Sequence, residues 1–198
     1  MAFIDAVKEA ITQKPANLKR PHFYKADSDA IRQLEQLKEI NKIAPDAIKP
    51  QIEQDIKMLS YGIAGEESIA FELNNSSLPV IVLHDLHIVY EDLSAQIDYL
   101  IITNKFTLVI ECKNLIGNIE VNSNGDFIRT LQYNGKYKKE GIYSPITQNM
   151  RHLEMIRKVR LARKNNFLTQ TLFEKYFDEN YKSVVVLANP KTVVNMKY

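Results

Sequence analysis

Two apolar runs separated by a polar pair are the feature that most constrains how this chain folds. Ile97–Thr103 and Phe106–Ile110 flank Asn104 and Lys105, which predicts a β-hairpin with a two-residue loop. Both runs are apolar at successive positions, so both faces of the hairpin need a cover. The sequence therefore predicts a central sheet that is packed on two sides.

Four polar side chains fall on one face at one end of this hairpin. If the loop is Asn104–Lys105, Asp98 lies opposite Glu111 and Gln96 lies opposite Lys113. Facing carboxylates in a buried sheet repel each other and are costly to desolvate. A divalent cation between them would relieve this repulsion, and oxygen ligands favour Mg²⁺ or Mn²⁺. The alternative is a buried salt bridge from Lys113 to one carboxylate.

The composition is that of an ordinary globular protein with one cysteine. Cys112 excludes an internal disulfide and a cysteine-rich zinc site, and its place in the strand points its side chain to the opposite, buried face. The net charge of +2 gives no global nucleic-acid signature, but basic residues are concentrated between residues 133 and 165. No signal-peptide layout or membrane-spanning run is visible, so we expect a cytoplasmic protein.

The first 60 residues predict helices without a chemical motif. Helical periodicity over Ala2–Gln13 is followed by an expected linker, Asn17–Lys25. A helix capped by Asp27 or Ser28 and ending at Ile43, and a further helix from about residue 47, are expected to pair as a hairpin. We expect residues 1–60 to form a helical extension with a structural or homo-oligomerising role.

Between this extension and the hairpin, the stretch YGIAGEESIAFELNN has a helical pattern. Gly62 and Gly65 each cost about 1 kcal/mol in a helix relative to Ala, so a close approach to the sheet or a helix start at a ligand site is expected. Glu66 is either a ligand there or a solvated helix residue. His84 and His87 have no evident ligand partner in the strand region that follows and are expected to be structural.

After the hairpin the pattern changes to short strands and then to helices. Residues 117–121 and 126–132 predict strands joined by an Asn-Gly turn at 124–125, and a second Asn-Gly pair at 134–135 continues an antiparallel meander. Ser144 and Pro145 predict a helix start, with Gln148 and Arg151 near its positive end. The expected apolar stripe of this helix is Ile146, Met150, Leu153, Ile156 and Val159. A further helix over residues 167–177 and a buried strand over residues 183–188 are expected.

Taken together, GIAGE, AQIDYLIIT, LVIECKNLIGNI, GDFIR and SPITQN resemble the nuclease-related domain (NERD) family, a branch of the PD-(D/E)xK nuclease superfamily. The resemblance covers roughly residues 61 to 161. It implies a restriction-endonuclease-like α/β fold: a three-layer core with a mixed sheet and an antiparallel meander flanked by helices. We expect this domain to span residues 61–198, and the sequence leaves open a truncation at its C-terminus.

The resemblance also implies site residues by position. Asp98, Glu111 and Lys113 match the D…ExK core, although Ile97 stands where the superfamily label has proline. Glu66 matches the helix glutamate and Gln148 the later helix glutamine. The implied ligands of Mg²⁺ or Mn²⁺ are Asp98, Glu111, Glu66 and the Cys112 backbone carbonyl. The expected nucleic-acid contacts are Lys136, Lys138, Lys139 and Arg151.

The expected function is metal-dependent hydrolysis of DNA phosphodiester bonds, leaving 5′-phosphate ends, with little sequence preference. Contacts to the nucleic-acid backbone give affinity without sequence reading, and the sequence contains no base-reading module. DNA rather than RNA is implied by the resemblance alone. The alternative is a catalytically silent nucleic-acid-binding or scaffolding module on the same fold.

Overall fold

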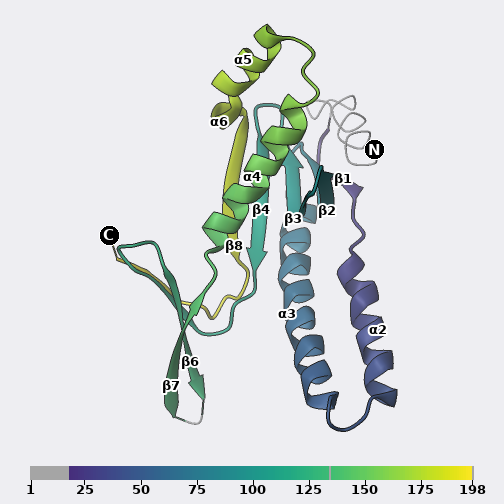
Figure 1. Ribbon diagram of the computed structural model, residues 1–198, viewed down its shortest axis with the longest axis vertical. Helices are drawn as coiled ribbons and strands as arrows, with labels where there is room; N and C mark the ends of the chain where they lie inside the picture. Colours follow the sequence, from purple (N-terminus) through teal and green to yellow (C-terminus); the bar gives the residue numbers. More distant parts are fainter. Residues whose placement is uncertain (1–17, 134, 198) are drawn as a thin grey trace.

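A computed structural model describes residues 18–133 and 135–197 (Figure 1). These residues form two mixed β-sheets flanked by helices, and the predicted α/β class with helices at the N-terminal end is confirmed. The predicted helix over Ala2–Gln13 lies outside the described residues.

The central sheet has five strands in the order β1-β2-β3-β4-β8. They are β1 (His22–Lys25), β2 (Ile81–Tyr90), β3 (Leu93–Ile102), β4 (Thr107–Lys113) and β8 (Tyr181–Leu187). The hairpin β3–β4 has the predicted register, since Tyr99 pairs with Ile110 and Ile102 with Thr107. The antiparallel pairs β2–β3 and β3–β4 lie between parallel pairs at both edges of the sheet.

Both faces of the central hairpin are buried, as its apolar pattern predicts. On one face Leu100, Ile102 and Val109 pack against Met155 and Ile156 of α4 (Pro145–Leu161). On the other, Tyr99, Ile101 and Ile110 pack with Ile69 of α3 (Lys49–Asn74). Two helices therefore cover opposite faces of the sheet and give the expected three layers.

The N-terminal helices pair as predicted, but two details differ. Ser28 caps α2 (Asp29–Ile43) through its side chain. The next helix, α3, continues through Gly62 and Gly65 without a break, so the predicted boundary between residues 60 and 61 falls inside it. The linker interpretation of Asn17–Lys25 is wrong for its second half, because His22–Lys25 form an edge strand parallel to β2. The four residues of β1 are too few to show the alternation of apolar and polar side chains that predicts a strand.

The predicted meander forms a second sheet instead of extending the first. Its order is β7-β6-β5-β9, made of β5 (Asn118–Val121), β6 (Phe127–Tyr133), β7 (Lys136–Ile142) and β9 (Val194–Met196). The predicted turn between β5 and β6 has Gly125 at φ +83°. The strand β9 was not predicted because a three-residue strand leaves no periodicity. In Figure 1, β6 and β7 project away from the core at the same end of the molecule as the α2–α3 hairpin.

The helix α4 begins where predicted, with Ser144 as its cap, but its buried face differs from the predicted stripe. Ile146 and Met150 are exposed, whereas Asn149 and His152 are buried. The side-chain amide of Asn149 donates to the carbonyls of Val109 (3.2 Å) and Val184 (2.9 Å), which ties the helix to β4 and β8. Leu153, Ile156 and Val159 of the predicted stripe do pack against the core. Apolar periodicity was therefore right for the second half of the helix and wrong at Ile146 and Met150.

The chain between α4 and β8 contains two short helices in place of the single one expected over residues 167–177. They are α5 (Phe167–Lys175) and α6 (Phe177–Asn180). Phe177 is buried and stacks on Tyr181 at the start of β8, with 4.6 Å between ring centroids. The predicted strand over residues 183–188 corresponds to β8.

Candidate active site

One cleft of about 610 Å³ brings together all five predicted site residues. It lies between α3 and β6, and the ends of β3 and β4 also line it. Glu66 comes from α3, Asp98 from β3, and Glu111 and Lys113 from β4. Gln148 enters from the first turns of α4. Residues far apart in the sequence thus converge on one surface.

The two strands separate at the cleft, and Asp98 occupies the point of separation. The β3–β4 ladder ends at Tyr99–Ile110, one residue before Asp98 and Glu111. Beyond it the backbone N–H of Cys112 donates to Asp98 Oδ2 at 2.6 Å. The carboxylate therefore takes the place of a strand partner and remains partly accessible from the cleft.

Both carboxylates are perturbed by their surroundings. Burial and then the charge of Glu111 raise the pKa of Asp98 to about 7. Burial also raises the pKa of Glu111, which is 1% exposed, although Lys113 opposes this shift. Buried acids of this kind are characteristic of sites that work on ions or protons, but buried ion-pair networks shift pKa values too.

Lys113 forms the salt bridge that the sequence left open as an alternative. Its Nζ lies 2.6 Å from Glu111 Oε1. The other oxygen, Oε2, lies 3.3 Å from His152 Nδ1, but neither atom has a hydrogen-bond partner among the described residues. One oxygen of a buried carboxylate is therefore left without a donor, which normally costs free energy.

Glu66 is held by His84, which was expected to be structural and not a ligand. His84 Nε2 lies 2.6 Å from Glu66 Oε2, and the imidazole stacks on Tyr99 with 4.5 Å between ring centroids. The Tyr99 hydroxyl donates to the Glu66 carbonyl at 2.8 Å. This contact agrees with the structural role expected for His84, although the sequence did not indicate Glu66 as its partner, and His87 is exposed. The contact between the histidine and Glu66 crosses from strand to helix, and no sequence spacing reveals it.

His152 is a site residue that the sequence did not predict. It lies one helical turn after Gln148 on α4 and is buried beside Glu111. Burial and then the charge of Lys113 lower its pKa, which favours the neutral imidazole. The spacing of four residues from Gln148 was a usable signal, since such residues share a helix face.

The predicted nucleic-acid contacts fall on different surfaces. Lys136 and Lys138 share one face of the second sheet with Arg129, which lines the cleft; Lys139 lies on the other face. Arg151 is exposed on α4, with its guanidinium 5.4 Å from the centre of the Tyr143 ring.

Part of the basic block between residues 133 and 165 serves packing. Arg157 pairs with Glu174 (2.7 Å) and Asp178 (3.0 Å) and lies over the Phe177 ring. This arginine fastens α4 to the two short helices that follow it.

The donor set in the cleft is compatible with a hard divalent cation. Within residues 18–133 and 135–197, no three His, Cys, Asp or Glu side chains gather closely enough to hold a metal ion by themselves. Mg²⁺ needs only one or two protein carboxylates, because water and substrate phosphate supply its other ligands. Asp98 and Glu111 supply two carboxylates to this cleft, and Glu111 Oε2 has no hydrogen-bond donor among the described residues.

Comparison with known families identifies the class of protein. Residues 61–188 match the family model described as the nuclease-related domain, NERD. The matched segment is more than half of the chain, and the chain belongs to this family. No curated protein and no solved structure matches it. None of the helices in the described part of the chain is long and apolar enough to cross a membrane.

Proposed function

We propose that this chain is a metal-dependent nuclease that hydrolyses DNA phosphodiester bonds with little sequence preference and leaves 5′-phosphate ends. The observation that carries the proposal is the pair of perturbed carboxylates, Asp98 and Glu111, beside Lys113 in one cleft. A nuclease-related domain implies a nucleic-acid substrate. The choice of DNA over RNA comes from the family resemblance.

Asp98, Glu111, the Cys112 carbonyl and Glu66 are the groups that would hold Mg²⁺ or Mn²⁺. A bound ion would lower the pKa of a water molecule and offset charge on the phosphate oxygens. The partnerless Oε2 of Glu111 supports this role, because a buried carboxylate oxygen without a donor gains most from a cation.

Lys113 and Gln148 would act on the water and on the substrate backbone. The Lys113 ammonium is held at Glu111 Oε1 and lines the cleft, where it can orient the attacking water and stabilise the proton transfer. The Gln148 side-chain amide lines the same cleft near the N-terminus of α4, where phosphate oxygens are favoured. His84 would keep Glu66 oriented through their 2.6 Å contact.

One observation favours a catalytically silent binding module instead. The Glu111–Lys113 salt bridge partly neutralises the site without a metal, as in a purely structural ion pair. Such a module would bind DNA with a steep dependence on salt and would not cut it.

Cleavage assays separate the two functions. Purified protein is incubated with linear, circular and single-stranded DNA in Mg²⁺, Mn²⁺ or EDTA, beside Glu111→Ala and Lys113→Ala. We expect cutting that EDTA abolishes and that either substitution lowers by at least about a hundredfold, within the range for loss of an acid–base or charge-stabilising group. Cutting that is undiminished in both variants would indicate a contaminant or another site. No cutting of any substrate by the wild type would favour the binding module.

Calorimetric titration with Mg²⁺ tests the ligands apart from activity. The wild type should bind the ion weakly without substrate, since phosphate is missing from the coordination shell. Asp98→Ala should lose this binding, while a substitution of the exposed Asp92 should retain it. Equal binding by wild type and Asp98→Ala would refute the assignment of Asp98 as a ligand.

A further inference from the structure

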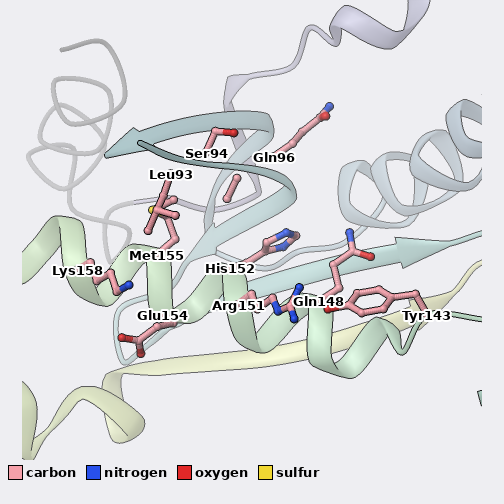
Figure 2. A pocket seen from close by; sticks show the side chains of 11 residues that line it. Leu93, Ser94, Gln96, Tyr143, Gln148, Arg151, His152, Glu154, Met155 and Lys158 are labelled. Atoms are coloured by element: carbon pink, nitrogen blue, oxygen red, sulfur yellow. The ribbon is translucent and has the colours of Figure 1, made fainter. Parts of the chain in front are cut away.

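A second cavity lies next to the cleft and shares part of its lining with it. It has a volume of about 470 Å³ and lies between the start of β3 and α4 (Figure 2). Gln96 and Gln148 line both the cleft and this cavity. A strand with one phosphate at Asp98 and Glu111 would therefore have a neighbouring nucleotide at the mouth of the second cavity.

Gln96, at the boundary between the two cavities, is hydrogen-bonded to Asp85 of β2. Gln96 Nε2 donates to Asp85 Oδ1 at 2.6 Å, and Asp85 also accepts the Asp29 backbone N–H at 2.7 Å. Asp85 is 8% exposed and adopts a left-handed backbone conformation with φ +51°. This unusual conformation for a non-glycine residue indicates a position fixed by its surroundings. Gln96 is exposed, but its hydrogen bond to the buried Asp85 restricts its side chain at the boundary between the two cavities.

The lining of the cavity combines an aromatic ring, apolar side chains and positive charge. Figure 2 shows Tyr143, Gln148 and Arg151 toward one end, with Leu93 and Met155 toward the other. Tyr143 remains 54% exposed although Arg151 lies over its ring. A base can therefore reach the ring, and base–aromatic stacking is the usual means of holding unpaired nucleotides.

The charges around the cavity favour a phosphate-bearing ligand. Arg151 and Lys158 lie at its edge, and Arg151 is exposed. Among the described residues of the lining, Glu154 is the single acid. It lies 3.4 Å from Arg157 Nε in a salt bridge, so part of its charge is offset. The site thus presents cations to a backbone and an apolar, aromatic surface to a base.

We propose that this second cavity binds the base of an unpaired nucleotide next to the scissile phosphate, stacked on Tyr143 with its phosphate at Arg151. The proposal rests on the nuclease function above and narrows its substrate to single strands, frayed ends or duplexes that open locally. A paired base cannot enter between β3 and α4, because its partner strand would have to enter with it.

Binding in EDTA tests the proposal without any need for cleavage. Fluorescence anisotropy compares a short single-stranded DNA, the same chain built from abasic units, and a blunt duplex of the same sequence. We expect the wild type to bind the base-bearing strand about tenfold more tightly than the abasic strand, the magnitude of one stacked base. Tyr143→Ala should remove that difference and leave duplex affinity unchanged, and Tyr143→Phe should restore it.

Two further tyrosines make the test specific. Tyr137 is 72% exposed on β7 and lines neither cavity, so Tyr137→Ala should behave as the wild type. Tyr61 lines the main cleft, and a base preference that disappears in Tyr61→Ala but persists in Tyr143→Ala would overturn the proposal. Equal affinity of the wild type for base-bearing and abasic strands, or binding of neither, would overturn it as well.

The two sets of experiments distinguish failure of the nucleotide site from failure of the nuclease function. DNA cutting without a base preference would leave the nuclease function standing and remove the nucleotide site. A Tyr143-dependent base preference in a protein that cuts no DNA would leave the base-binding cavity standing and remove the nuclease function.

Discussion

At the scale of single residues, the buried carboxylates of the cleft lower the free energy of unfolding when they are charged. Asp98 and Glu111 are both desolvated, and the charge of Glu111 adds to the raised pKa of Asp98. Lys113 stabilises only one of them directly, through Glu111 Oε1. A site that opposes folding stability in this way is typical of residues retained for binding or catalysis.

We expect Asp98→Asn to stabilise the metal-free protein, and more so at alkaline pH. The folded pKa of about 7 lies above the ordinary value of 3.8, so the folded state favours protonated Asp98. The stabilisation that the folded state gains from protonated Asp98 is complete below about pH 4 and is lost as the pH rises through 7. The shift is about 3 pKa units and one unit corresponds to about 1.4 kcal/mol, so we expect a gain of up to about 4 kcal/mol at pH 8.5.

Urea unfolding in EDTA at about pH 5 and pH 8.5 measures this gain. Asp92→Asn is the matched control, because Asp92 is exposed and lies outside the cleft. A gain for Asp98→Asn that is the same at both pH values would mean that Asp98 is not perturbed as the structure indicates.

At the scale of elements, α3 is positioned by one glycine. A Cβ on Gly65 would lie 2.8 Å from the Asn114 Cβ and 3.2 Å from the Cys112 Sγ. The absence of a side chain therefore lets the helix pass close to the end of β4 and carries Glu66 to the cleft. Gly62, one turn earlier, has no atom within 4 Å of such a Cβ.

These two glycines give a matched pair of substitutions with opposite signs. Gly65→Ala should destabilise the protein by about 1–3 kcal/mol, the usual cost of overpacking, and should displace Glu66. Gly62→Ala should stabilise it by up to about 1 kcal/mol, because alanine is the better helix former. Thermal unfolding of both variants checks this, and a stabilised Gly65→Ala would show that α3 does not approach β4 so closely.

At the scale of the whole molecule, two projecting elements flank the cleft. The α2–α3 hairpin stands on one side, and β6 and β7 stand on the other (Figure 1). Arg129 of β6 lines the cleft, so the second sheet places a guanidinium at the site. Its salt bridge with Glu140 offsets part of that charge. Lys136 and Lys138 extend the face that carries Arg129.

We expect this face of the second sheet to contact the DNA backbone. The double variant Lys136→Ala/Lys138→Ala should weaken DNA binding and lower the slope of log affinity against log salt by about 2, because each of the two lysines neutralises one phosphate. Lys139→Ala is the control, since Lys139 lies on the opposite face. Salt titrations by anisotropy give the slopes, and an equal weakening in the control would mean that DNA contacts both faces.

The sequence by itself determined the central hairpin, its register and its two buried faces. A two-residue loop and continuous apolar runs leave few other pairings, and register then assigns Asp98, Glu111 and Lys113 to one end. Capping signals predicted the start of α4 at Ser144 and that of α2 at Asp27 or Ser28, of which Ser28 is the cap. These features depend on neighbours in the sequence, so local rules were sufficient to find them.

Only the tertiary structure decided which distant groups meet. The contact of His84 with Glu66, the place of His152 beside Glu111, and the separate sheet closed by β9 all join segments remote in sequence. The burial of Asn149 on α4 was also not predictable, because it is buried by hydrogen bonds to two strands and not by apolar character. The periodicity of a sequence predicts which face of one element is buried. The contacts of His84, His152 and Asn149 depend instead on the shape of the neighbouring element.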